Sequence, residues 1–421
     1  MSTVVMAGLC HSTAPLSLLE RVAVPVSRRA DVLSAVCAAG FDEVVLLTTC
    51  SRTEIYAAGG ASADLLVDVL AALAGDASDA VRRTATVRVG DEVAPHLFSV
   101  TSGLASRVIG EPEIRSQVRA AFREACAADV TGGVLGELFS AAVQVATRVH
   151  RETELGSTTR SLGCRAVDLG LGGTKPAPEV LVVGSGRMAA TAVSHLRRLG
   201  HRAGVVARDQ GRAVQLAGAS DARRLSDLVG LMETADVVIC ATSASEPLLT
   251  VEDVRRATAG RPDSLVLVDL SVPRNVEPAV ADVEGVRVID LEAMHDPAVD
   301  ATLVQSVAQA EALVRTSARK HRDHLAARRV GPVIAAMRRG IEAECLEAIS
   351  GPATATVSPE DLVRVARVVA GRLAHAPTMA ARAAAAAGDD AAILAICMAF
   401  DVTLTPEMVG LGTPAHEQSP A

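Results

Sequence analysis

The chain has 421 residues, of which 49% are hydrophobic, and its net charge is −8. This length is enough for two or three domains, and this composition excludes extended disorder. No uncharged apolar stretch of about 18 residues occurs, which argues against a membrane-spanning helix. The excess of acidic residues argues against nonspecific binding to DNA. One tyrosine, five phenylalanines and no tryptophan are too few to build base-stacking platforms for single-stranded nucleic acid.

The eight cysteines and two lysines limit the chemistry further. No Cys-x-x-Cys pair and no Cys/His cluster with zinc spacing occurs, so no metal site is predicted. The cysteines are expected to be free thiols in a reducing compartment. The first residues lack the basic start and apolar core of a signal peptide, which favours the cytoplasm. Lys175, in a Pro/Gly segment, and Lys320, in a charged helix, are the only lysines, which disfavours Schiff-base chemistry.

Residues 1–155 are predicted to form an α+β domain. Strands are expected at 4–9, 43–47 and 84–89, and helices at 27–39, 65–73, 117–127 and 134–149. The strand at 43–47 leads into a polar segment that contains Cys50, Arg52 and Glu54. The end of a strand is a rigid position from which side chains can meet a ligand.

The spacing of Cys50 and Arg52 suggests how the thiol could be activated. On an extended backbone, residues two apart share a face, and a guanidinium there would favour the nucleophilic thiolate. Arg52 could instead bind a substrate carboxylate through two hydrogen bonds. A structural cysteine beside a surface salt bridge is the alternative that the local sequence leaves open.

A Gly/Pro-rich linker at 172–178 separates this region from an alternating pattern within residues 156–298. Strands at 179–183, 202–207, 236–241, 265–270 and 286–289 alternate with helices at 188–199 and 212–217. That alternation predicts a parallel, doubly wound, Rossmann-like sheet.

The first strand of this sheet leads into a glycine motif that predicts a dinucleotide site, with cofactor-binding residues Gly184, Ser185, Gly186, Arg187, Met188 and Ala189. Gly184 allows a tight turn, Gly186 lets a pyrophosphate approach the backbone, and Ala189 permits close helix packing. The second strand ends at Arg208 without the acid that binds a ribose diol, and Asp209 comes one residue late. NADPH is therefore predicted over NADH, with a solvated strand end as the alternative.

Residues 299–421 are predicted to be entirely helical, with helices at 302–329, up to 349, at 359–375 and at 379–398. An elongated helical region with little globular pattern of its own favours dimerisation. Residues 315–340 contain eight Arg/Lys and one acid, a local charge of +7. A solvated helix face explains this charge, and contact with a nucleic-acid backbone is the other hypothesis.

Taken together, these segments resemble the glutamyl-tRNA reductase family over nearly the whole chain. The supporting motifs occur in the family's order at 8–15, 49–54, 96–98, 103–106, 110–114 with Gln117, 184–189, 269–274 and 373–378.

The resemblance implies that Cys50 attacks the ester of glutamyl-tRNA(Glu), that an enzyme thioester forms, and that NADPH reduces it to glutamate-1-semialdehyde. This is the first step of the C5 route to 5-aminolevulinate and tetrapyrroles. Covalent catalysis divides one difficult reduction into two easier steps. The resemblance also implies a swing of the nucleotide domain toward Cys50, a homodimer through the C-terminal helices, and the downstream glutamate-1-semialdehyde aminomutase as a partner.

By this resemblance, Cys50 and His96 are catalytic, His96 by polarising the ester carbonyl or assisting proton transfer. Arg52 is expected on a substrate carboxylate and Glu111 on the ammonium group. The remaining substrate-binding residues are Thr49, Ser51, Ser106, Pro112, Glu113 and Gln117.

The chain also departs from the family pattern at several positions. Ser51 stands where asparagine is usual, Glu113 where glutamine is usual and Cys10 where asparagine is usual, and the segment 157–164 differs as well. These differences motivate an alternative function, a weakly active paralogue that regulates in response to tRNA or haem. A dehydrogenase of a shikimate-like acid is a third hypothesis, but it leaves the Cys50 motif and the helical C-terminus without a purpose.

Overall fold

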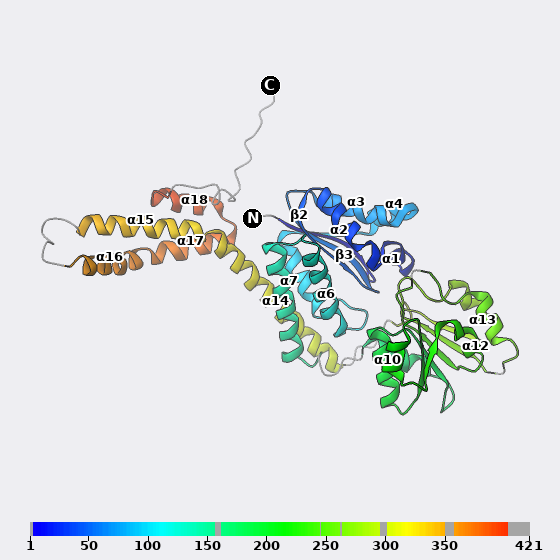
Figure 1. The fold of residues 1–421 in the computed structure, drawn as a ribbon. Helices are drawn as coiled ribbons and strands as arrows, with labels where there is room; N and C mark the ends of the chain where they lie inside the picture. Colours follow the sequence, from blue (N-terminus) through cyan, green and yellow to red (C-terminus); the bar gives the residue numbers. More distant parts are fainter. Residues whose placement is uncertain are drawn as a thin grey trace, which may run out of the picture. The chain divides into compact units, whose positions relative to one another are not determined.

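The structure is a computed structural model that describes residues 3–155, 161–244, 246–261, 263–294, 301–349 and 358–402 (Figure 1). Their contacts divide the chain into two compact units, residues 2–315 and residues 316–421. The proposed domain boundaries at 155/156 and 298/299 border or fall within segments outside the described residues. So do residues 157–160 of the segment that departs from the family pattern.

The N-terminal domain is built on a four-stranded antiparallel sheet in the order β2-β3-β1-β4, which confirms the predicted α+β class. Its strands are β1 (Val4–Cys10), β2 (Phe41–Thr48), β3 (Arg52–Gly59) and β4 (Thr86–Val89). One face packs on α1 (Leu16–Val22), α2 (Arg29–Ala38), α3 (Ala63–Ala74) and α4 (Ser78–Thr84). The other face packs on α5 (Val93–Thr101), α6 (Glu113–Ala127) and α7 (Gly133–Glu152). Strand β3 and helices α1, α4 and α5 were not among the predicted elements.

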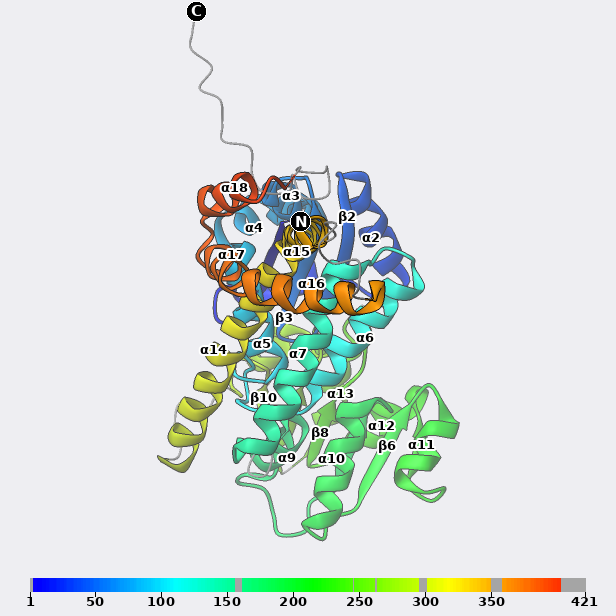
Figure 2. The same cartoon turned by 90° about the vertical axis from the view of Figure 1, so that its left-hand side faces the viewer.

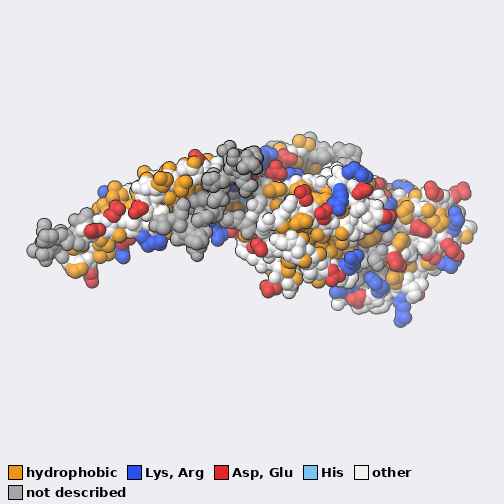
Figure 3. Space-filling model, turned by 90° about the horizontal axis from the view of Figure 1, so that it is seen from above, with side chains coloured by type: hydrophobic (Ala, Val, Ile, Leu, Met, Phe, Trp, Pro, Cys, Tyr) orange, Lys and Arg blue, Asp and Glu red, His pale blue; other side chains and the backbone are white. Residues whose placement is uncertain are grey.

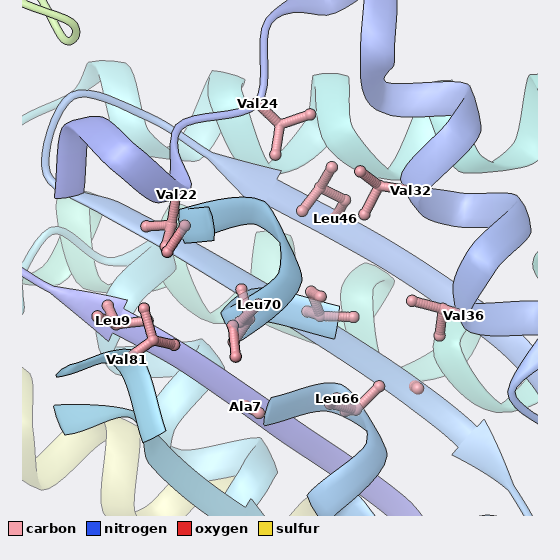
Figure 4. Packing of buried hydrophobic residues seen from close by; sticks show 14 of the residues in the cluster. Ala7, Leu9, Val22, Val24, Val32, Val36, Leu46, Leu66, Leu70 and Val81 are labelled. Carbon is pink, nitrogen blue, oxygen red and sulfur yellow. The ribbon is translucent and has the colours of Figure 1, made fainter. Parts of the chain in front are cut away.

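Strand β3 is buried along its whole length, and its side chains pack on both faces of this sheet. Ile55 and Ala57 point into the cluster under α3, where Figure 4 shows Leu66 and Leu70 packed near Ala7 and Leu9 of β1. Burial of each large aliphatic side chain stabilises the fold by about 1.5–3 kcal/mol. Tyr56 points the opposite way and meets the Phe139 ring of α7 edge-on, at 5.4 Å between ring centroids. Residues 52, 54 and 56 therefore share the face that carries polar groups.

The Rossmann-like domain, residues 161–294, contains a six-stranded parallel sheet in the order β10-β9-β8-β5-β6-β7. Its strands are β5 (Val180–Val183), β6 (Ala203–Ala207), β7 (Ala222–Arg224), β8 (Val237–Cys240), β9 (Leu265–Asp269) and β10 (Val286–Ile289). Helices α9 (Leu162–Leu171), α10 (Arg187–Arg198) and α11 (Gln210–Ala217) cover one face, and α12 (Leu228–Met232) and α13 (Val251–Thr258) the other (Figure 2). The predicted doubly wound sheet is confirmed, whereas the short edge strand β7 and the helices α9, α12 and α13 were not among the predicted elements.

The C-terminal unit is helical throughout its described residues, as predicted. Helix α14 (Ala301–Arg329) is followed by α15 (Gly331–Ile349), α16 (Pro359–Leu373), α17 (His375–Ala387) and α18 (Asp390–Ala399). The single helix predicted at 379–398 is wrong, because Gly388 adopts φ +71° and Asp389 caps a new helix by accepting the Ala392 N–H at 2.9 Å. Figure 3 shows hydrophobic side chains on the surface of this unit. The exposed large hydrophobic residues of α16 to α18 are Val365, Val368, Val369, Leu373, Met379, Leu394 and Met398.

Candidate active site

Cys50 lies in the turn between β2 and β3, which the Thr49 N–H closes by donating to the Arg52 carbonyl at 2.8 Å. The backbone here is not extended, so the prediction that Cys50 and Arg52 share a strand face is wrong. Cys50 is half-buried, and its Sγ lies 3.7 Å from the Ser51 Oγ. The turn therefore presents the thiol at the end of a rigid two-stranded element.

Arg52 instead belongs to a buried network on the polar face of β3. Its Nη1 donates to Glu54 Oε1 at 2.7 Å, and its Nη2 donates to the Ala105 carbonyl. Tyr56 OH donates to Glu54 Oε2 at 2.6 Å, and His96 Nε2 lies 3.1 Å from Glu54 Oε1. Although burial disfavours the charged carboxylate, Arg52 and His96 hold the pKa of Glu54 down at about 2. Glu54 thus joins the two residues that were predicted to bind and polarise the substrate.

Glycines create the space for this network. A Cβ at Gly8 would lie 2.6 Å from Glu54 Cγ, so only a glycine on β1 leaves room for that side chain. A Cβ at Gly103 would lie 2.9 Å from the Glu111 N and Gly110 atoms, and Gly103 has φ +80°. This tight loop between α5 and α6 brings the Ala105 carbonyl to Arg52 and places Glu111 near the thiol.

Two neighbouring acids, Glu111 and Glu113, are buried, and Glu111 acts on the nucleophile. Burial and the neighbouring Glu113 raise the pKa of Glu111 to about 7, and burial also raises the pKa of Glu113, whose Oε2 has no hydrogen-bond partner in the described part of the chain. Burial and Glu111 in turn raise the pKa of Cys50 to about 11. The pocket therefore disfavours the free thiolate and is suited to a ligand that brings positive charge to the acids.

The cation that opposes these effects at Cys50 is Arg107, and not Arg52 as the sequence suggested. Arg107 is 7% exposed and donates from Nη1 to the Leu291 carbonyl at 3.1 Å. Leu291 belongs to a hydrophobic cluster of the Rossmann-like domain against which Cys50 and Val108 pack. The thiol therefore faces that domain.

The other predicted substrate-binding residues lie in this turn, in the loop between α5 and α6, and at the start of α6. Thr49 accepts the Ser51 N–H at 3.1 Å, and Ser51 and Ser106 are buried. Pro112 is the exposed N-cap of α6, and Gln117 is half-buried on the same helix. The structure thus brings these residues to one region, while their contacts with a substrate stay a prediction.

The sequence analysis did not predict Glu54 and Tyr56 as site residues, and it did not single out Arg107 at all. A signal for the first two existed, because Arg52, Glu54 and Tyr56 alternate at the period of a strand. For Arg107 no local signal exists. It lies between small and apolar residues in a loop, and its neighbours come from distant segments.

The carboxyl ends of β5, β6 and β8 form the predicted nucleotide site. Gly184 has φ +122°, and a Cβ there would lie 2.3 Å from the Ala241 carbonyl oxygen, so the turn requires glycine. A Cβ at Gly186 would meet nothing within 4 Å, which leaves open space over the start of α10. Because no side chain caps α10, its first N–H groups are available to an anion. Ala189 is fully buried against the sheet. These residues fit a dinucleotide pyrophosphate.

Polar residues at the ends of β8 and β9 have structural partners. Asn275 Oδ1 accepts hydrogen bonds from Thr242 Oγ1 at 2.7 Å and from Ser271 Oγ at 2.8 Å. The Asp269 carboxylate accepts the N–H groups of Ser271, Asn275 and Val276. These bonds shape the edge of the sheet where the ligand is expected.

The raised pKa of Glu111 predicts a pH-dependent stability. The folded state keeps this proton up to pH 7, whereas the unfolded state releases it near pH 4.5. The stabilisation is therefore complete below about pH 4.5 and is lost as pH rises to 7. The difference corresponds to about 3 kcal/mol. We expect Glu111→Gln to remove much of this loss in urea unfolding at pH 5 and pH 8. The exposed control Glu92→Gln should behave as the parent, and an unchanged pH dependence in Glu111→Gln would contradict the prediction.

None of the described helices is long and apolar enough to cross a membrane. No group of three or more His, Cys, Asp or Glu side chains among the described residues could hold a metal ion.

Comparisons with known proteins agree with the geometry. A family model described as "Glutamyl-tRNAGlu reductase, N-terminal domain" matches residues 7–153. One for "Shikimate / quinate 5-dehydrogenase" matches residues 173–296, and one for "Glutamyl-tRNAGlu reductase, dimerisation domain" matches residues 309–402. The shikimate-type match is thus confined to the Rossmann-like part of the chain.

Two curated relatives are named glutamyl-tRNA reductase. The protein from Salinispora arenicola (strain CNS-205) is 36% identical, and the alignment covers 96% of this chain and 93% of the relative. The protein from Salinispora tropica is 34% identical with the same coverage. A solved structure of glutamyl-tRNA reductase from Methanopyrus kandleri is 28% identical, with 93% of this chain and 99% of that chain covered and a TM-score of 0.42.

Proposed function

Because the chain belongs to the glutamyl-tRNA reductase family, we propose that it reduces glutamyl-tRNA(Glu) to glutamate-1-semialdehyde with NADPH, at the start of the C5 route to tetrapyrroles. The observation that carries this proposal is the position of Cys50. A half-buried thiol stands at a hairpin turn, among buried ionisable side chains and against the hydrophobic cluster of a Rossmann-like domain.

In the proposed reaction the Cys50 sulfur attacks the ester carbonyl carbon. A C–S bond forms as the bond to the terminal adenosine oxygen breaks, and that oxygen leaves with a proton. Bound NADPH supplies the hydride that reduces the thioester carbonyl carbon. Cleavage of the C–S bond then releases the aldehyde and regenerates Cys50. His96, held by Glu54, is proposed to polarise the carbonyl or move the proton, and it lies beside Arg52, which is proposed to bind a carboxylate.

The pKa values of the two acids support a role for the substrate's ammonium group. Glu111 raises the pKa of Cys50, and Arg52 is the cation that favours the charged form of Glu111. An ammonium group at Glu111 would cancel the repulsion between Glu111 and the thiolate, so substrate binding would help to form the thiolate that attacks it. Burial also raises the pKa of Glu113, whose charged form Arg187 and Thr191 favour.

For the cofactor, a nucleotide site is evident from the fold, and NADPH is our proposal. Arg208 is exposed at the end of β6, and no ion pair of the described residues involves it. The Asp209 carboxylate already has a structural partner, because its Oδ1 accepts the Arg212 N–H at 3.1 Å and caps α11. A free guanidinium and an occupied carboxylate favour a 2′-phosphate over a ribose diol.

We expect Arg208→Ala to raise the KM for NADPH by about tenfold or more and to leave the KM for NADH nearly unchanged, since one charge-assisted phosphate contact is lost. Steady-state kinetics with both nucleotides measure this. Arg255→Ala, which removes an exposed arginine on α13, is the matched control. Equal effects on NADPH and NADH would exclude the assigned role of Arg208.

We also propose a homodimer formed through the C-terminal helices, in accordance with the matched dimerisation model and the exposed valines, leucines and methionines of α16 to α18. The aminomutase partner and the cytoplasmic location stay predictions. Contact between the basic segment 315–340 and the tRNA backbone is also still a prediction. Most arginines of this segment are exposed.

A direct test combines an assay with trapping. Purified protein is incubated with glutamyl-tRNA and NADPH, with free glutamate and NADH as controls, and semialdehyde is measured. With NADPH withheld, mass spectrometry should find a glutamyl adduct on Cys50. An adduct on another residue, or none, would exclude this mechanism. Binding of tRNA and NADPH without product would favour the regulatory alternative, which the raised pKa of Cys50 and the charge of Glu113 also favour.

A further inference from the structure

Arg107 is a buried cation beside the nucleophile that has no role in the reaction described so far. It lies in the loop between α5 and α6 and is 7% exposed. Its Nη1 donates to the Leu291 carbonyl at 3.1 Å. Its Nε is buried without a hydrogen-bond partner among the residues that the structure describes. Burying a guanidinium with an unused N–H is costly unless an anion compensates it.

The Cys50 thiol is a neighbour of Arg107 that could become an anion. Cys50 and Val108, the residue after Arg107, pack on the same hydrophobic cluster, which also contains Leu291. Burial lowers the pKa of Arg107, and among the groups that oppose this effect Cys50 acts most strongly, ahead of Glu292 and Asp290. Arg107 in turn favours the charged form of Cys50, against burial and Glu111.

The other nearby arginine is not available for this role. Arg52 is held by Glu54 at 2.7 Å and by the Ala105 carbonyl, so its charge is compensated before any thiolate forms. Arg107, in contrast, donates a hydrogen bond to a neutral carbonyl. Glu292 and Asp290 also favour its charge, but no hydrogen bond among the described residues joins either carboxylate to Arg107.

Several contacts hold the segment to which Arg107 is anchored. Glu292, next to Leu291, accepts the Leu16 N–H at 3.0 Å. Nearby, Arg274 donates from Nε and Nη2 to the Glu20 carboxylate at 2.8 and 2.7 Å. These bonds join α1 to the segments after β9 and β10, so the carbonyl that anchors Arg107 is itself held. A preorganised cation stabilises a developing anion without reorganisation at the moment of reaction.

We propose that Arg107 is the residue that stabilises the Cys50 thiolate, so that the thiol's reactivity depends on this guanidinium rather than on Arg52. The proton of the thiol passes to solvent, and no other bond changes. The inference deepens the proposed function and rests on Cys50 being its nucleophile. The reactivity of the thiol can nevertheless be measured without tRNA or NADPH.

The test is alkylation of Cys50 by iodoacetamide in the full-length protein at several pH values, read by peptide mass spectrometry to separate Cys50 from the other seven cysteines. Arg107→Gln keeps a donor for the Leu291 carbonyl and removes the charge. We expect about tenfold less thiolate at pH 8 and a three- to tenfold slower reaction, because a more basic thiolate is individually more reactive. Arg107→Lys, which keeps the charge, should stay within about threefold of the parent.

The control is Arg119→Met, which removes an exposed arginine on α6 and should leave the alkylation rate unchanged. Circular dichroism checks folding, and if Arg107→Gln does not fold, Arg107→Met is measured in its place. A folded, uncharged variant that reacts at the parental rate at every pH overturns the proposal. A different result is slower alkylation in that variant together with a parent protein that makes no semialdehyde. It would contradict the proposed function but support the role of Arg107.

Discussion

Cys50→Ser is expected to lower semialdehyde formation from glutamyl-tRNA by at least about 10³-fold, which corresponds to about 4 kcal/mol in the activation barrier. A serine hydroxyl is far less acidic than a thiol and is a weak nucleophile without an adjacent base. The fold should not change, because the Sγ makes one long polar contact among the described residues, 3.7 Å to the Ser51 Oγ, and serine has nearly the same shape. NADPH oxidation and direct product detection measure the activity, and circular dichroism measures the fold.

Cys126→Ser is the matched control for this variant. Cys126 is exposed, at the end of α6, and its Sγ lies 3.3 Å from Thr131 Oγ1. Full activity in Cys126→Ser with loss in Cys50→Ser would assign the chemistry to one sulfur. Parental activity in a folded Cys50→Ser protein would mean that a different group receives the glutamyl chain.

Glu54→Ala is expected to cost about 3–5 kcal/mol of unfolding free energy, because it leaves Arg52 buried and uncompensated. It also removes the acceptor that orients Tyr56 and His96. We therefore expect a large loss of activity as well as stability. Urea unfolding followed by circular dichroism measures the stability.

The pH dependence of this contribution has the opposite sign to that of Glu111. Because the pKa of Glu54 is lowered to about 2 in the folded state, its stabilisation is present above about pH 4.5 and is lost as pH falls toward 2. Glu311→Ala removes one partner of an exposed ion pair with Arg315 and should cost no more than about 1 kcal/mol. A cost equally small in Glu54→Ala would show that the buried network does not stabilise the fold.

Much of the architecture could be predicted because local sequence patterns specify it. The alternation of apolar strands and amphipathic helices after residue 178 has few solutions other than a parallel sheet. Gly184, in the turn after β5, is needed by the backbone itself, as its φ shows. Short elements were missed where local signals are weak, as at the three-residue β7 and at the break between α17 and α18.

The sequence by itself determined which chemical groups are present, namely a thiol after a strand, a glycine turn before a helix, and an arginine at the end of the second strand. Only the tertiary structure decided which charges act on the thiol. Antiparallel pairing of β1 with β3 places Glu54 opposite Gly8 and gives Arg52 its partner. A loop some fifty residues later supplies Arg107 and Glu111 instead. Electrostatic effects depend on distance and burial in space, and spacing along the chain records neither once the backbone turns.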